Sequence, residues 1–198
     1  MIPTPNECCA LLQAYKVPEH IIRHSRVVHR VALHLCQELN QQGEKLDQAE
    51  VEAGSLLHDI AKMEGLHTGE KHSQAGAILL GRLGYPEVAE IVRQHVVLDD
   101  GTPQNQITEA AVVHYADKRV QHTSVVSLAE RFQDLKERYG KNPAALSWLE
   151  DLEKRSLALE KRIFEKLSIK PESLISLQPT TFPRGEQASP ESSSSRDK

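Results

Sequence analysis

The 198-residue sequence predicts an all-α fold, a single helical bundle of six or seven helices. Apolar residues return every three or four positions along most of the chain, and no segment shows the sustained alternation of a strand. Aromatic residues make up only 4% of the sequence, so aliphatic side chains must supply most of the core. The length suits one core of ordinary size, with little room for a second domain.

The first two helices are expected over residues 5–15 and 19–41. The first should end before Val17 and Pro18, because a proline disfavours helical geometry in the residue that precedes it. The second should stop at Gly43, since glycine commonly follows the last helical residue. Residues 1–18 are therefore assigned to an N-terminal helix that precedes the core.

The next helices belong to the expected core, residues 19–120. A third helix should begin after Leu46, with Asp47 as its N-cap and Glu50 at the capping-box position, and end near residues 63–65. Shorter helices over residues 71–83 and 86–97 follow, with Pro86 at a helix start. A loop at residues 98–106 then leads to a helix over residues 108–120.

Beyond residue 120, two further helices are expected to cover the core, within residues 121–177. They should span residues 124–139 and 143–167, separated by a break at residues 140–142. Residues 178–198 are rich in Ser and Pro and poor in aliphatic residues, so we expect a disordered tail.

Composition argues against several classes of function. The formal net charge is −4 and no dense Lys/Arg run is present, so no extended nucleic-acid surface is evident. No window supplies the roughly 18 apolar residues that span a bilayer, and the N-terminus lacks the pattern of a secretory signal. Three cysteines, two of them adjacent, support neither a disulfide framework nor a Cys-rich zinc site. A cytoplasmic protein that does not bind membranes is therefore expected.

Four histidines and two aspartates occur where a helical face should turn toward the core. They are His24, His58, Asp59, His72, His95 and Asp117. Such groups are costly to bury without partners, and divalent metal would satisfy them together. Imidazole and carboxylate ligands without thiolate suit iron, manganese, cobalt, nickel or zinc, and six ligands exceed one tetrahedral site. The set therefore predicts two metal ions.

Each of these residues taken alone has a simpler explanation. A single inward histidine is more often hydrogen-bonded in a core, and Asp117 could pair with Lys118 or Arg119. Their order on successive helices is what favours metal binding. The remaining helical histidines are expected on solvated flanks or polar faces, namely His20, His29, His34, His114 and His122. His67 could protonate a leaving group, although an exposed loop histidine is the simpler interpretation.

The order of these residues resembles the HD superfamily, whose defining pattern is a His, then a His-Asp pair, then a later Asp. The matching segments are RHSRVVHRVA around His24, LLHDIAK around the pair, and HYADKRV around Asp117. The segments KHSQAGAILL and IVRQHV add His72 and His95, as in the six-ligand branch that includes bacterial symmetric diadenosine tetraphosphate hydrolases. The resemblance covers about residues 19–120 and implies an HD-type helical bundle.

The resemblance also implies a dinuclear centre. One ion would be held by His24, His58, Asp59 and Asp117 and the other by His72 and His95, with Asp59 bridging both. The ions would be iron or manganese first, with cobalt, nickel, zinc or magnesium as alternatives. The implied reaction is phosphoester or phosphoanhydride hydrolysis by a metal-bound hydroxide, on a small phosphorylated substrate of nucleotide type.

Asp59 and Lys62 are the expected catalytic residues. Lys62 follows Asp59 by one helical turn and can bind a substrate phosphate, although an exposed lysine near a helix end is an equally good interpretation. Arg26 and Arg119 are further candidates for phosphate contact, and both also suit surface or salt-bridge roles.

Two other functions remain open at this point. HD-type di-iron oxygenases use a similar six-ligand set, and an HD module can also serve in signalling or binding without catalysis, although such modules usually lack ligands. The acidic, proline-containing continuation that follows the final Asp in the diadenosine hydrolases is absent, so a dinucleotide substrate is in doubt. The long late helices are compatible with a homodimer.

Overall fold

A computed structural model of the chain describes residues 1–99 and 106–177. Within these ranges the chain is almost entirely helical, which confirms the all-α fold class. The elements are α1 (Pro5–Ala14), α2 (Glu19–Gln41), α3 (Gln48–Leu57), α4 (Lys62–Thr68), α5 (His72–Arg82), α6 (Pro86–Gln94), α7 (Glu109–Lys118), β1 (Val120–Gln121), β2 (Ser124–Val125), α8 (Leu128–Tyr139), α9 (Pro143–Glu165) and a 3₁₀ helix, η1 (Pro171–Leu177). The expected tail at residues 178–198 and most of the loop at residues 98–106 lie outside the described residues.

The described residues form nine α-helices and one 3₁₀ helix. This exceeds both the six or seven helices expected and the eight segments assigned to them, in part because the expected third helix is interrupted. It ends at Leu57 and resumes as α4 at Lys62. His58 Nδ1 bonds to the Ser55 carbonyl at 2.8 Å, which is the carbonyl that the Asp59 amide would use in a continuous helix. The turn instead closes through tighter bonds, such as Ile60 N–H to Leu57 O at 3.0 Å.

The expected helix start at residue 124 is wrong, because residues 120–125 form a short β-hairpin. Val120 pairs with Val125, and Gln121 pairs with Ser124, in antiparallel register. The turn between the strands places His122 at φ 55°, a left-handed conformation that suits a two-residue hairpin turn. Helix α8 begins only at Leu128, after a Ser127 capping box.

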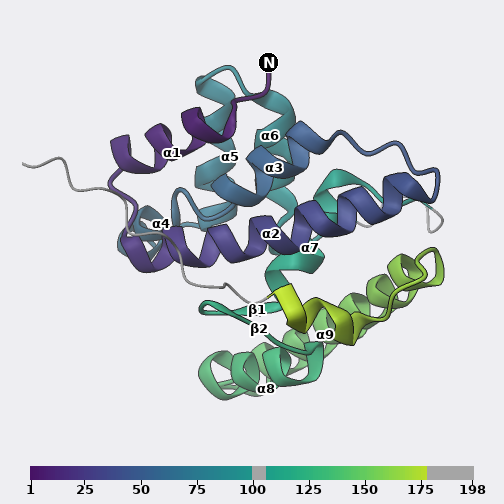
Figure 1. The fold of residues 1–198 in the computed structure, drawn as a ribbon. Coiled ribbons are helices and arrows are strands. Elements are labelled where there is room, and N and C mark those ends of the chain that lie inside the picture. The colour runs from purple at the N-terminus through teal and green to yellow at the C-terminus, as the bar shows by residue number, and fades with distance from the viewer. Residues whose placement is uncertain (100–105, 178–198) are drawn as a thin grey trace, which may run out of the picture.

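Helix α2 crosses the middle of the molecule and separates two packed groups of helices (Figure 1). On one side lie α1, α3, α5 and α6, with a core that includes Leu12, Leu57 and Val88. On the other side the β-hairpin, α8 and α9 lie together, and a larger core joins α2, α7 and α9 through residues such as Val31 and Ile163. No described helix combines the length and the apolar character needed to cross a membrane.

Because α3 packs closely against α6 at Gly54, even one added methyl group at this position should destabilise the fold. An added Cβ would lie 2.6 Å from Ile91 Cγ2, closer than carbon atoms can approach. We expect Gly54→Ala to lower the free energy of unfolding by about 1–3 kcal/mol, because the core must shift to admit the methyl group. Chemical denaturation measures this change.

Gly81 offers a matched control on α5. A Cβ added there meets nothing within 4 Å, so Gly81→Ala should instead raise the free energy of unfolding by up to about 1 kcal/mol through helix propensity. Equal effects of the two substitutions would contradict the packing that the structure shows at Gly54.

Candidate metal centre

The six expected metal ligands converge where α2, α3, α5, α6 and α7 meet. His24 lies in α2, His58 and Asp59 in the turn after α3, His72 at the start of α5, His95 directly after α6, and Asp117 in α7. Five of the six side chains belong to buried residues, and His72 is half-buried. The break after Leu57 is what turns the His-Asp pair into this junction.

Asp59 occupies the centre of the cluster. Its Oδ1 lies 3.3 Å from His72 Nε2 and 3.7 Å from His95 Nε2, and its Oδ2 lies 3.4 Å from His58 Nε2. Two groups of three donors result, with the donor atoms of each group within 4.8 Å of one another: His24, His58 and Asp59, and Asp59, His72 and His95. Asp59 is the member that both groups share.

Asp117 completes the first group from the α7 side. Its Oδ1 lies 3.1 Å from His24 Nε2 and 3.6 Å from His58 Nε2. Its Oδ2 accepts a hydrogen bond from Lys118 Nζ at 2.8 Å. The lysine therefore fixes the carboxylate with one oxygen turned toward the histidines.

Backbone carbonyls orient three of the histidines. The Nδ1 atoms lie 2.7–2.9 Å from carbonyl oxygens, in the pairs His24–His122, His58–Ser55 and His95–Val92. A carbonyl oxygen can only accept, so each Nδ1 carries a hydrogen, and Nε2 is the nitrogen that can bind a metal ion when the ring is neutral. This is the arrangement by which proteins aim a histidine at a metal ion.

The residues present fit divalent metal ions. His58 Nε2 is buried and has no hydrogen-bond partner among the described residues, although such nitrogens are normally satisfied. His72 Nε2 and His95 Nε2 lie 3.1 Å apart, so that a lone pair of His95 faces the other imidazole. A cation would satisfy these atoms together with the carboxylates, and nitrogen and oxygen donors without sulfur suit iron or manganese.

The protonation states of Asp59, Asp117 and His95 suit metal binding. Burial would lower the pKa of His58, but the carboxylates of Asp59 and Asp117 outweigh it and raise this pKa, so a metal ion would take the place of a proton there. Burial would raise the pKa of Asp59, but the neighbouring nitrogens of His58, His72 and His95 outweigh it and hold the pKa well below its usual range. Burial likewise opposes ionisation of Asp117, and Lys118, His24 and His58 more than compensate. Burial lowers the pKa of His95 to about 4, which keeps this imidazole neutral. Ionised carboxylates and neutral imidazoles are the forms that ligate metal.

Lys62 lies at the mouth of the cluster. Its Nζ is 2.6 Å from Asp59 Oδ2, and 40% of its side chain is exposed. Burial would lower the pKa of Lys62, but the Asp59 carboxylate outweighs it and raises the pKa, so the side chain stays an ammonium ion. Lys62, His24 and Asp59 all line one cavity of about 450 Å³, which opens the centre to solvent.

Arg119 forms a salt bridge, the role expected as its alternative to phosphate contact, and it is not among the residues that line this cavity. The side chain is 2% exposed, and Nη1 lies 3.1 Å from Glu160 Oε2 in α9. Nε donates to the Val126 carbonyl at 2.6 Å and Nη2 donates to the Pro171 carbonyl at 3.0 Å. Arg119 therefore ties α7 to the segments that follow it, and it does not line the cavity beside the centre.

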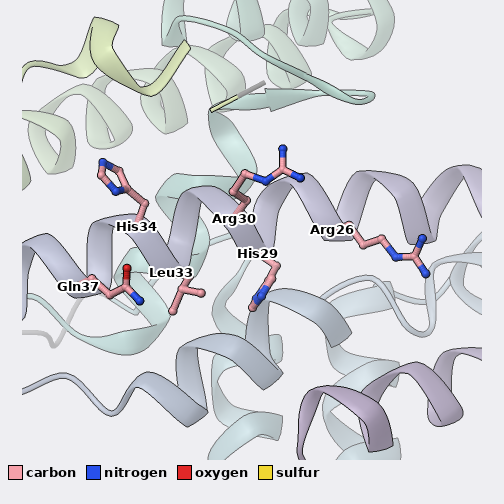
Figure 2. Close-up of a pocket in the computed structure, with 6 residues that line it drawn as sticks. All are labelled: Arg26, His29, Arg30, Leu33, His34 and Gln37. Carbon is pink, nitrogen blue, oxygen red and sulfur yellow. The ribbon is translucent and has the colours of Figure 1, made fainter. Parts of the chain in front are cut away.

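Arg26 also lies apart from the centre. It is exposed on α2, two residues after His24 and thus about 200° around the helix axis. Figure 2 shows it at one end of a separate hollow along α2, of about 430 Å³. The hollow is lined by Arg26, His29, Arg30, Leu33, His34 and Gln37. Arg26 is not among the residues that line the cavity beside the centre, so its suggested contact with phosphate stays a prediction.

His114 was expected on a solvated face, and this expectation is wrong. Its residue is only 2% exposed, and its Nδ1 donates to the His95 carbonyl at 2.9 Å. Lys118 Nζ donates to the same oxygen at 3.2 Å, so α7 holds the backbone of His95 in place. The signal was present in the apolar sequence AAVVHYA, since a helix that is apolar on all sides is a buried one.

The other histidines divide by their surroundings. His20 and His122 are exposed, as expected, whereas His29 and His34 are half-buried. His29 Nδ1 lies 3.2 Å from Ser55 Oγ. The side chain of His67 lies outside the described part of the chain, so its suggested role as an acid stays a prediction.

The fold and the cluster together define an all-α protein with a buried His/Asp site suited to metal. The family model of the HD domain matches residues 21–120, a range that contains all six clustered residues. The chain belongs to the HD-domain family, whose members are mostly metal-dependent phosphohydrolases. No solved structure matches the chain significantly.

Proposed function

We propose that the protein hydrolyses phosphoester or phosphoanhydride bonds of a small, nucleotide-type substrate with a dinuclear metal centre. The shared position of Asp59 carries the proposal, because one carboxylate between two groups of donors is how a protein places two ions side by side. One ion would bind His24, His58, Asp59 and Asp117, and the other would bind Asp59, His72 and His95. Iron or manganese suits these ligands best, with cobalt, nickel, zinc or magnesium as alternatives.

When bound, the ions would supply an activated water molecule and stabilise negative charge on phosphoryl oxygens. Lys62 supports this chemistry, since its Nζ lies 2.6 Å from Asp59 Oδ2 and the side chain lines the cavity. From there it can donate to a phosphoryl oxygen as a point charge. The volume of about 450 Å³ falls in the range of small-ligand sites.

The first test is phosphate release from a panel of nucleotides and phosphoesters under anaerobic conditions. We expect the manganese- or iron-loaded protein to release product, chelation to reduce the rate to background, and reloading to restore it. A fully loaded protein that releases nothing would contradict the proposal. Turnover that instead requires both iron and oxygen would favour the di-iron oxygenase, and full loading without any turnover would favour a binding module.

The number of ions is a separate measurement. His72 belongs to one donor group only, so His72→Gln should lower the metal content by one ion per chain, as read by elemental analysis. An unchanged metal content in this variant would count against the second metal position.

A further inference from the structure

Helix α8 forms one wall of the cavity that opens the candidate metal centre. Arg131, Leu135, Arg138 and Tyr139 of this helix line the cavity together with Asp59, and the match to the HD domain ends at residue 120. The wall therefore lies outside the part of the chain that the family defines. Residues in such a position are the ones that adapt a common metal centre to one substrate.

Two arginines of this wall are held by one carboxylate. Asp134 Oδ2 lies 3.2 Å from Arg131 Nη1, and Asp134 Oδ1 lies 2.8 Å from Arg138 Nε. Spacings of three and four residues put all three side chains on the same side of α8. Two guanidinium groups share a single negative charge, so the group keeps a net positive charge toward the cavity.

The hydrogen bonding of this pair of arginines leaves one donor of Arg131 unused. Arg131 Nε is buried and has no hydrogen-bond partner among the described residues. Arg138 Nη2 lies 2.9 Å from His122 Nε2, and the carbonyl of His122 accepts from the ligand histidine His24 at 2.9 Å. Arg138 is thus linked to the metal side of the cavity through the β-hairpin turn.

The side chains around the cavity carry a net positive charge, which favours an anion larger than one phosphoryl group. Lys62, Arg131, Arg138 and Arg23 line it, against Asp59 as its one lining carboxylate among the described residues. A single phosphoryl group at the metal centre beside Lys62 leaves the two arginines of α8 with only the Asp134 carboxylate between them. Guanidinium groups bind phosphate through paired hydrogen bonds, and they do so most strongly where other donors surround the site.

We propose that Arg131 and Arg138 form a second anion subsite, which binds a phosphoryl group other than the one that is hydrolysed. The substrate class that follows is a molecule with at least two phosphoryl groups, one at the metal centre and one at α8. The reaction assigned to it rests on the proposed function, whereas the binding at α8 does not. Tyr139, 61% exposed at the same wall, offers a surface for the organic part of such a molecule.

The binding test compares methylenediphosphonate with methylphosphonate by calorimetry. The wild-type protein should bind the diphosphonate more tightly, and Arg131→Gln should weaken that binding by roughly 10- to 100-fold, as expected for lost hydrogen bonds between charged groups. Binding of methylphosphonate should change by less than about threefold in this variant, because its single phosphonate group binds at the metal centre and does not need Arg131. Arg131→Lys should bind the diphosphonate with an affinity between those of the wild type and Arg131→Gln, since lysine keeps the charge and loses the paired donors.

Arg155→Gln serves as the matched control. Arg155 lies on α9, pairs with Asp151 at 2.8 Å and does not line the cavity, so its loss changes net charge without touching the subsite. The control should bind both ligands as the wild type does. Thermal unfolding of every variant checks that the fold is kept.

Turnover separates this inference from the proposed function. With the loaded protein, Arg131→Gln should lower kcat/KM for adenosine diphosphate by roughly 10- to 100-fold and leave adenosine monophosphate within about threefold. The second subsite would be overturned if Arg131→Gln lowered kcat/KM equally for the two nucleotides. It would also be overturned if the variant changed neither kcat/KM for the nucleotides nor the affinity for the phosphonates. If the wild type hydrolyses neither nucleotide yet binds the diphosphonate through Arg131, the proposed function fails and the subsite stands.

Discussion

Replacing Asp59 with asparagine should remove both bound ions or leave them only weakly held, and lower phosphate release by at least roughly a thousandfold. Asp59 is the one residue common to both donor groups, with its two oxygens 3.3–3.7 Å from the nitrogens of His58, His72 and His95. An amide has the same shape but offers one neutral oxygen in place of a charged pair. Elemental analysis of metal content and rates on the substrate panel measure the two effects.

Asp151→Asn is the matched control for this substitution. Asp151 lies on α9, is 58% exposed and pairs with Arg155, so the same chemical change should leave metal content and rate as they are. A full complement of metal in Asp59→Asn would show that the carboxylate does not bridge. Loss of metal in the control as well would point to damage of the fold instead of the site.

Local signals in the sequence were enough to predict most of the helices. Helix α2 spans Glu19–Gln41 as expected, Asp47 caps α3 through the amides of Ala49 and Glu50, and Pro86 begins α6. These features depend on neighbours a few residues apart, which is why periodicity and caps reveal them. The interruption at residues 58–61 is also local, but periodicity and caps do not reveal it, because it depends on the His58 side chain bonding to the Ser55 carbonyl in place of a backbone amide.

The hairpin at residues 120–125 was hidden for a different reason. Each strand has only two residues, too few for an alternating pattern to be recognised, and the left-handed residue is a histidine instead of a glycine. The hairpin nevertheless contributes to the site, since its His122 carbonyl accepts a hydrogen bond from His24 Nδ1 at 2.9 Å.

The candidate site was predictable only in part. Its six clustered residues stand out because ionisable groups on inward faces are unusual. The surroundings depend on contacts between distant segments, such as α8 beside the cavity and Arg119 beside Glu160, 41 residues further on. A single sequence contains no local signal for such pairs, so Arg119 remained a further candidate for phosphate contact beside Lys62.

Arg119→Met should lower the free energy of unfolding by about 3–5 kcal/mol, the cost of breaking a buried ion pair from one side. The side chain is 2% exposed and joins Tyr115, Val126, Glu160 and Pro171, so its removal leaves several acceptors without a donor. Chemical denaturation of the metal-free protein measures the loss. Well below the melting temperature, metal content and kcat/KM should match the wild type, because Arg119 does not reach the cavity.

Coupling with Glu160 tests the cause of that loss. If an uncompensated carboxylate is responsible, Arg119→Met combined with Glu160→Gln should be less destabilised than the sum of the two single variants, because the double variant buries no unpaired charge. Simple additivity would mean that packing and the carbonyl contacts of Arg119 carry the effect. A fall in kcat/KM without any loss of stability would instead indicate that Arg119 contacts the substrate. That result would contradict the structural role assigned to its contacts with Glu160, Val126 and Pro171.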